Sequence, residues 1–281
     1  MSSRLQLKHT DHPMDTNTMT AEVPIVQSQS EGVVILTLNR PKQYNALSLA
    51  TLELLHTALD GVAADESVRV VVIAANGGAF CAGHDLKEMR AAKSQAFVTK
   101  LFQLCSDAML KIARLPVPVI AEVNGMATAA GCQLVAQCDL AIAADTAKFA
   151  VSGVNLGLFC STPAVPLSRA ISRKRAAEML MTGEFIDAAT AQDWGLLNRV
   201  VPSADLRAET QKMANALMSK PRSTLATGKA LFYRQLEAGL EDAYGDASAT
   251  IACNFMDADA QEGVAAFLEK RKPDWDQSGA L

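Results

Sequence analysis

Apolar residues form two kinds of pattern up to about residue 155, and the two patterns alternate along the chain. Short runs rich in β-branched residues predict strands, at 33–38, 68–75, 117–123 and 139–144. Between these runs, apolar residues recur every three or four positions and predict helices, one beginning after Ser48 and the others at 94–114 and 129–137. The run at 68–75 is almost unbroken, which is typical of a strand buried on both faces of a parallel sheet. The alternation of strand and helix indicates an α/β fold.

The pattern changes to an almost entirely helical one from about residue 162. The predicted helices cover 162–171, 173–182, 187–195, 205–219, 222–244, 246–257 and 260–270, with one short strand candidate at 198–201. Residues 1–24 are polar and aperiodic, and we expect them to form a disordered extension. These changes divide the chain into an extension (1–24), an α/β core (25–200) and a C-terminal helical region (201–281).

Two loops rich in small residues follow buried strands, at the edge where ligands bind in open α/β sheets. One covers residues 78–87 and the other covers 124–131, where it opens a helix. Backbone N–H groups at the start of a helix have no acceptor within the helix and attract negative charge. Two such loops side by side would direct two N–H donors at one oxygen and form an oxyanion hole. Turns of this kind also serve as plain connections, so the spacing alone leaves both interpretations open.

Composition narrows the classes of partner. The chain of 281 residues has 26 Lys and Arg against 30 Asp and Glu, a net charge of −4, which gives no electrostatic reason to expect nucleic acid. The apolar runs are far shorter than the ~20 residues that a membrane span needs, so we expect no membrane partner. The six cysteines lack C-x-x-C spacing and the four histidines lack metal-ligand spacing. We therefore expect free, buried thiols and no metal site.

Seven stretches, in order along the chain, resemble motifs of the enoyl-CoA hydratase/isomerase (crotonase) family. They are 38–48, 80–88, 118–125, 131–139, 180–184, 191–197 and 261–273. The resemblance extends over residues 25–275, and the segments 127–133 and 153–162 most resemble the branch called enoyl-CoA hydratase domain-containing protein 3. It implies the crotonase fold, a repeated ββα spiral core followed by a C-terminal helical trimerisation region. The implied assembly is a homotrimer or a dimer of trimers.

The resemblance also implies which residues hold a substrate. The backbone N–H groups of His84 and Ala130 would bind the thioester oxygen of an acyl-CoA; the family usually has Gly at the second position, and the methyl group of Ala narrows the approach. The coenzyme A contacts would fall on Lys42, Ala46, Ala82, His84, Asp85, Leu86 and Lys87, with Phe267 and Lys270 contributed by a neighbouring subunit. Coenzyme A would enter as part of the substrate, and no separate cofactor is implied. Lys42 and Lys270 are alternatively plain surface lysines.

The departures from the family pattern concern the acid–base groups. Hydration of a double bond needs one group to activate water and another to deliver a proton. The two hydratase glutamates would fall on Gln133 and Gly153, and a third acidic position used by some members falls near Ser161. Gln133 is able to orient a water molecule without acting as a base. His84 has an unperturbed pKa suited to acid–base work, and a histidine in this position resembles the acyl-CoA decarboxylases of the family. Their partner tyrosine would fall near Cys160.

Two further side chains have competing interpretations. Cys160 as a nucleophile has no partner nearby in the sequence, which favours an inert thiol. Glu122 lies on the strand that enters the second loop, and we expect a structural carboxylate rather than a catalytic one.

Three functions remain open. The first is an enoyl-CoA hydratase-like lyase or isomerase of fatty-acid or acyl-CoA metabolism that uses Gln133 or an unforeseen acid. The second is a carboxyacyl-CoA decarboxylase that uses His84, and the third is a non-catalytic acyl-CoA binding or regulatory protein. We expect the bacterial cytoplasm as the location, with the mitochondrial matrix as the alternative. A transit peptide is poor in acidic residues, whereas residues 1–24 include Asp11 and Asp15.

Overall fold

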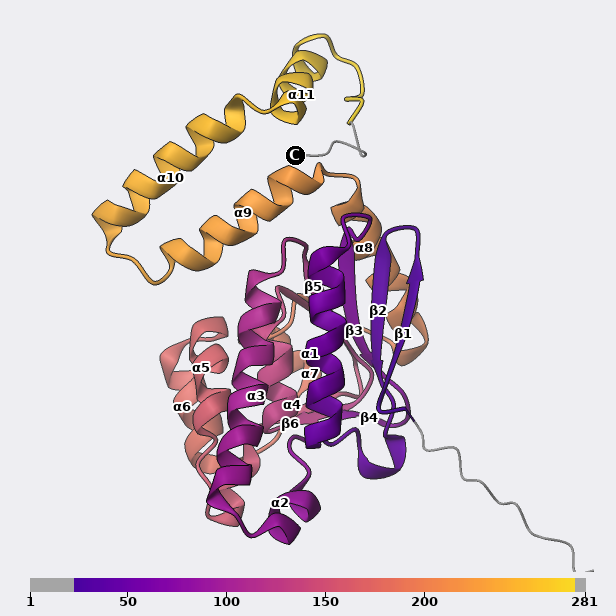
Figure 1. Ribbon diagram of the computed structural model, residues 1–281, viewed down its shortest axis with the longest axis vertical. Helices are drawn as coiled ribbons and strands as arrows, with labels where there is room; N and C mark the ends of the chain where they lie inside the picture. The colour runs from indigo at the N-terminus through magenta and orange to yellow at the C-terminus, as the bar shows by residue number, and fades with distance from the viewer. Residues whose placement is uncertain (1–22, 276–281) are drawn as a thin grey trace, which may run out of the picture.

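Six strands form the larger of two sheets in the computed structural model, which describes residues 23–275 (Figure 1). In spatial order they are β1 (Ile25–Ser30), β2 (Val33–Leu38), β3 (Val70–Ala75), β5 (Val119–Val123), β7 (Leu140–Ala144) and β10 (Arg199–Val201). β1 pairs with β2 in antiparallel fashion, and the remaining pairs of this sheet are parallel. The predicted extension at 1–24 lies, apart from its last two residues, outside the described residues.

A second, smaller sheet is made of very short strands. Its order is β4 (Ala79–Cys81), β6 (Met126–Thr128), β8 (Lys148–Ala150) and β9 (Ile186–Asp187). Each of β4, β6 and β8 follows a strand of the larger sheet after a few residues and leads into a helical segment. The core is therefore built from repeated ββα units, as the family resemblance implies.

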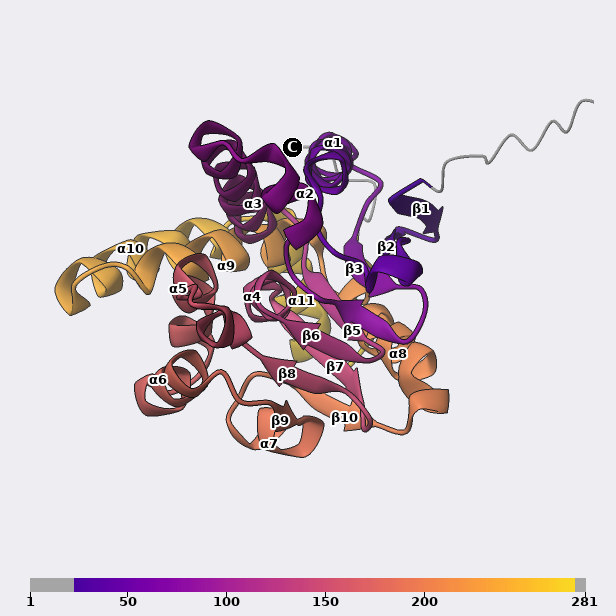
Figure 2. The same ribbon diagram turned by 90° about the horizontal axis from the view of Figure 1, so that it is seen from below.

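Helices cover both faces of the larger sheet (Figure 2). The helices of the core are α1 (Leu49–Ala64), α2 (Leu86–Ala92), α3 (Gln95–Arg114), α4 (Ala130–Gln137), α5 (Ser161–Ala170), α6 (Arg173–Thr182) and α7 (Ala188–Asp193). Val71 and Ile73 of β3 point into a core shared with α1, α3 and α4, while Val70 and Val72 point into a second core closed by α8 (Leu206–Met218). The prediction that this strand is buried on both faces is confirmed.

The last three helices form an arm that extends from the core (Figure 1). They are α9 (Arg222–Gln235), α10 (Leu240–Phe255) and α11 (Ala258–Leu268). A buried polar cluster fixes α9 to the core: the Lys229 ammonium donates to Asp139 Oδ2 at 2.7 Å and the Tyr233 hydroxyl donates to Asp139 Oδ1 at 2.8 Å. Asp139 Oδ2 also accepts from the Val119 N–H at the start of β5. None of the helices within residues 23–275 is long and apolar enough to cross a membrane.

Several predicted boundaries are wrong. The helices predicted at 222–244 and 246–257 are divided elsewhere, because the chain turns between Gln235 and Leu240 and Gly239 takes the extended N-cap position of α10. Apolar residues continue at helical spacing across this turn, so the pattern did not reveal it. The predicted loop at 78–87 contains β4 and the start of α2. The region after residue 162, in which the only predicted strand is 198–201, also contains the strand β9. The strands of the smaller sheet have two or three residues, too few to show a period of two.

Candidate active site

The first loop leaves β4 and is bound along its length by the segment before α1. The Ala82 N–H donates to the Tyr44 carbonyl at 3.0 Å, and the Leu47 N–H donates to the Gly83 carbonyl at 2.7 Å. The Asp85 N–H then donates to the Leu47 carbonyl at 3.2 Å. The backbone N–H of His84 falls between these bonds and has no acceptor among residues 23–275. Since the Gly83 N–H donates to Cys81 Sγ at 3.4 Å, His84 has the one N–H between Ala82 and Asp85 without a described acceptor.

The second loop ends at a residue in an unusual conformation. Ala129 has φ 50° and ψ −118°, a region that side chains rarely adopt, and its own N–H donates to the Ala150 carbonyl at 3.0 Å. The next residue, Ala130, is the first of α4, so its N–H has no acceptor within the helix. No other acceptor for the Ala130 N–H occurs in the described part of the chain.

Small residues bring the two loops into contact. Gly83 has φ +91°, and a Cβ atom placed on it would lie 2.9 Å from Ala129 Cβ and 3.2 Å from the Ala130 nitrogen. A Cβ atom on Gly131 would lie 2.1 Å from the Cys81 carbonyl oxygen. The Gly83–His84 peptide therefore adjoins the start of α4, and the two unpaired N–H groups lie on neighbouring edges. The oxyanion hole at His84 and Ala130 stays a prediction.

The side chain of His84 is largely enclosed. Its ring lies 4.7 Å from the Phe102 ring, edge to face, and both ring nitrogens are buried without a hydrogen-bond partner among the described residues. Burial lowers the pKa of His84 to about 4, and the nearby backbone of Leu47 offsets this only in part. The imidazole is therefore neutral at neutral pH, with one N–H donor and one acceptor available to a bound molecule.

The two positions expected for hydratase glutamates lie in different surroundings. Gln133 is on α4, three residues after Ala130, with its side chain buried and Oε1 unpaired within residues 23–275. Gly153 lies in the 3-10 helix η2 (Ser152–Leu156), where an added Cβ atom would be 2.5 Å from the Leu158 carbonyl oxygen and 2.8 Å from Cys160 Sγ. The backbone here leaves no room for any side chain at position 153. The sequence showed the missing carboxylate but not the closed space.

Cys160 and Glu122 both interact with other residues of the fold. The Cys160 thiol accepts a hydrogen bond from the Gly153 N–H at 3.3 Å, and burial raises its pKa, which disfavours the thiolate. Glu122 pairs with Arg207 at 3.2 Å on the face of the sheet covered by α8. Burial raises the pKa of Glu122, and Arg207 offsets this in part. Both observations agree with the structural roles that the sequence favoured.

The residues predicted to contact coenzyme A fall into two groups. The first group occupies the two hydrogen-bonded segments 40–48 and 81–87 and comprises Lys42, Ala46, Ala82, His84, Asp85, Leu86 and Lys87. Asp85 caps α2 and is paired with Arg40, so its carboxylate is already engaged. Phe267, which is 83% exposed, and Lys270 lie at the end of α11, at the opposite end of the molecule from α2 (Figure 1). A single chain does not bring the two groups together.

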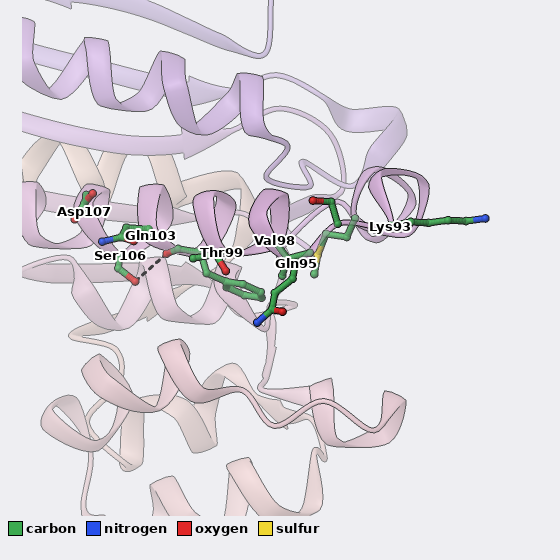
Figure 3. A pocket seen from close by; sticks show the side chains of 10 residues that line it. Lys93, Gln95, Val98, Thr99, Gln103, Ser106 and Asp107 are labelled. Carbon is green, nitrogen blue, oxygen red and sulfur yellow. Dashed lines mark hydrogen bonds between the residues drawn. The ribbon is translucent and has the colours of Figure 1, made fainter.

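An open groove of about 770 Å³ runs along α3. Phe102, Val98 and Met89 contribute its apolar part. Thr99, Gln103 and Ser106 follow one another along the same helix, as Figure 3 shows. Phe102 belongs to both the groove and the His84 contact. The sequence pattern gave no signal for its role, because it reads as one more apolar position of the helix.

Arg40 and Asn45 were not singled out from the sequence, although both lie in the first motif. Asn45 is buried, and its Nδ2 donates to the Asn76 and Ala79 carbonyls at 2.9 and 2.8 Å. Within residues 23–275, no three His, Cys, Asp or Glu side chains are grouped closely enough to hold a metal ion.

Comparisons with known proteins agree with this architecture. The family model described as Enoyl-CoA hydratase/isomerase matches residues 28–278. The mitochondrial enoyl-CoA hydratase domain-containing protein 3 of Mus musculus is 49% identical over 247 residues, which cover 88% of this chain and 82% of that protein. A probable enoyl-CoA hydratase of Mycobacterium bovis is 34% identical, over 91% of this chain and 98% of that protein.

Solved structures give the same result. An enoyl-CoA hydratase from Mycobacterium smegmatis superposes with a TM-score of 0.88 and 60% identity, over 90% of this chain and 98% of that chain. Human enoyl-CoA hydratase domain-containing protein 3 superposes with a TM-score of 0.87 and 48% identity, over 90% and 100% of the two chains. The expected crotonase fold is confirmed. The chain belongs to the enoyl-CoA hydratase/isomerase (crotonase) family and, within it, to the type of enoyl-CoA hydratase domain-containing protein 3.

Proposed function

We propose that this chain binds an acyl-CoA thioester and stabilises the negative charge that develops on the thioester oxygen when an enolate forms. The observation that carries the proposal is the pair of backbone N–H groups, of His84 and Ala130, that lie on adjoining loops without an acceptor among residues 23–275. Donors fixed in advance stabilise a developing oxyanion without having to reorient. Coenzyme A enters as part of the substrate.

The binding half of the proposal is tested with two ligands that differ by one oxygen. Butanoyl-CoA has the thioester carbonyl, and S-butyl-CoA, a thioether, lacks it. Two neutral hydrogen bonds to that oxygen predict that calorimetry will give a Kd about tenfold or more lower for butanoyl-CoA. Equal affinities for the two ligands would contradict the oxyanion hole.

For the reaction, we propose hydratase-like lyase or isomerase chemistry in acyl-CoA metabolism without the usual pair of carboxylates. Gln133 offers a buried, unpaired amide oxygen that is suited to orient water or substrate. It does not exchange a proton near neutral pH, and Gly153 leaves no space for a second group. In a hydration, the water that Gln133 orients would bond to Cβ, the Cα–Cβ electron pair would form the enolate, and the proton lost by that water would reach Cα through solvent. The Gln133→Ala variant should therefore lose the activity.

A carboxyacyl-CoA decarboxylase is the second candidate, favoured by the surroundings of His84. In that reaction the bond between Cα and the carboxylate carbon breaks, CO2 leaves and the electron pair forms the enolate, so no base is needed. Water then supplies the proton to Cα. The neutral His84 ring, packed on Phe102 and unpaired, provides a buried N–H donor for a substrate carboxylate in apolar surroundings. The His84→Ala variant should lose this activity.

A mass-spectrometric turnover screen separates the candidates. The purified protein is incubated with crotonyl-CoA, a longer trans-2-enoyl-CoA and methylmalonyl-CoA. A gain of one water supports the hydratase, and loss of CO2 supports the decarboxylase. Butanoyl-CoA binding without any product supports a non-catalytic acyl-CoA binding or regulatory protein.

We also propose that the complete site forms between chains of a trimer or a dimer of trimers. The distance between α11 and the loops around His84 supports this, as do the exposed large apolar side chains of the arm, which include Leu240, Tyr244 and Phe267. Analytical ultracentrifugation tests the assembly.

The compartment, bacterial cytoplasm or mitochondrial matrix, stays a prediction; the Mus musculus relative is named mitochondrial and the Mycobacterium smegmatis structure is bacterial.

A further inference from the structure

One arginine connects the first loop to the segment before α1. Arg40 Nη1 donates to the Ala46 carbonyl at 2.7 Å, and Arg40 Nη2 donates to Asp85 Oδ2 at 3.0 Å. The side chains of Arg40 and Asp85 are only 20% and 14% exposed, so water competes little for either. The planar guanidinium is suited to this task because it holds two donors in a fixed fork. The fork spans from the segment before α1 to the residue that directly follows His84.

The partners of Arg40 are themselves held rigidly. Asp85 Oδ1 accepts from the N–H groups of Lys87 and Glu88 at 3.1 and 3.2 Å and so caps α2. The Arg40 N–H donates to Asn45 Oδ1 at 2.8 Å, which ties the segment before α1 to the same network. Asn45 has a left-handed backbone with φ 55°, a conformation that needs such support. The first loop is thus fixed from both sides.

We propose that Arg40 is a positioning residue, which aims the backbone N–H of His84 at the thioester oxygen by clamping Ala46 to Asp85. The inference rests on the proposed function and assigns to the site a residue that does not itself touch the substrate. If the clamp opens, the bonds from Leu47 to Gly83 and from Asp85 to Leu47 lose their lateral support. The His84 N–H then becomes free to tilt away from the oxygen while the coenzyme A surface stays in place.

The test measures the carbonyl preference, the ratio of the Kd for S-butyl-CoA to the Kd for butanoyl-CoA. Calorimetry is carried out on the full chain, on Arg40→Gln and Arg40→Lys, and on Arg207→Gln as the matched control. Arg207 forms an ion pair with Glu122 on the other face of the sheet. A second readout is the absorbance of bound 2,4-hexadienoyl-CoA, which moves to longer wavelength when the carbonyl is polarised.

We expect Arg40→Gln to reduce the carbonyl preference roughly three- to tenfold, the size of one hydrogen bond to a carbonyl, and to reduce the absorbance shift. Its Kd for S-butyl-CoA should change less than threefold. Arg40→Lys keeps the charge but not the fork and should lie between wild type and Arg40→Gln, while Arg207→Gln should keep the wild-type ratio. If Arg40→Gln does not fold, Arg40→Lys alone decides, with the same direction expected.

Two results would overturn the inference. An unchanged ratio in the Arg40 variants means that the His84 N–H is aimed without the clamp. An equal loss of affinity for both ligands means that Arg40 only stabilises the fold. The absence of any carbonyl preference in the wild-type protein is a different outcome, because it refutes the oxyanion hole itself and removes the basis of this proposal.

Discussion

The two loops of the candidate oxyanion hole are held in place by different means. The first is fixed by polar side chains, with Arg40 and Asp85 as the central pair. The second has no side-chain cap at Ala129, and its position is set by close contact of small residues, above all Gly131 against the Cys81 carbonyl. The first loop should therefore respond to changes of charge and hydrogen bonding, and the second to changes of volume.

This difference also predicts how each loop fails. When one hydrogen bond of the Arg40–Asp85 network is lost, the others, such as those from Lys87 and Glu88 to Asp85, remain, so the first loop should loosen by degrees. An atom added against a backbone carbonyl in the second loop cannot be accommodated by moving a flexible side chain. The backbone itself must shift, so we expect the stability of the whole surrounding fold to decrease.

The largest effect is expected from one methyl group on the second loop. Gly131→Ala would place Cβ 2.1 Å from the Cys81 carbonyl oxygen, so β4 and α4 must separate. We expect the free energy of unfolding to fall by about 3 kcal/mol or more. Urea unfolding followed by circular dichroism measures it, at fixed protein concentration.

The matched control for that change is Gly61→Ala. Gly61 lies within α1, is exposed, and would have no atom within 4 Å of the added Cβ. The same substitution there should raise stability by about 0.5–1 kcal/mol, since Ala is the better helix former. Equal effects at positions 131 and 61 would show that close packing is not what fixes the second loop.

A smaller effect, which depends on pH, is expected from the His84 ring beside the first loop. Its pKa is about 4 in the folded protein and about 6.5 in the unfolded chain, so the unfolded chain binds more protons between these values. Stability should therefore fall as pH decreases from 7 to 5, by roughly 2 kcal/mol from this group. His84→Gln should remove that part of the slope in urea unfolding curves. An identical slope in both proteins would mean that the ring is charged or solvated in the fold.

Much of the fold could be predicted because its long strands and helices bury apolar residues at regular sequence spacing. The strand at 70–75 and the helix that begins at Leu49 bury long, regular sets of apolar residues, and both were found from the pattern. The strands β6 and β8 were missed because three residues show no period, and the turn before Leu240 was missed because nothing apolar changes there.

The candidate site likewise has features that the sequence predicted and features that it did not. Motifs identified the loops that carry His84 and Ala130, and they showed that Gln133 and Gly153 lack carboxylates. The clamp made by Arg40 could not be predicted, because it joins Ala46 to Asp85 across 39 positions of sequence through a backbone carbonyl that carries no residue signature. The closed space at Gly153 likewise depends on a carbonyl, that of Leu158.

A change of charge alone on the first loop should have a moderate effect. Asp85→Asn keeps a residue able to cap α2 but removes the charge that faces Arg40, so we expect a loss of about 1 kcal/mol at pH 7. Burial raises the pKa of Asp85, yet hydrogen bonds from Glu88 and Arg40 outweigh it and the net pKa is lowered. The stabilisation is therefore present above the unfolded pKa of about 4 and is lost as pH falls through the folded value. The gap between variant and wild type should narrow below pH 4; a constant gap would contradict the charge pair.

The smallest effect should come from two neighbouring alanines that respond with opposite sign. Ala129 has φ 50°, where glycine is free of strain, so Ala129→Gly should leave stability unchanged or raise it by about 0.5 kcal/mol. Ala130 is helical, and Ala130→Gly should lower stability by about 1 kcal/mol. Thermal and urea unfolding of the pair measure the difference. A loss of 1 kcal/mol or more in Ala129→Gly would mean that the packing of the Ala129 methyl group stabilises the turn into α4 by more than the backbone strain at φ 50° costs. Packing would then determine the stability of the second loop even at the residue with the least favourable backbone conformation.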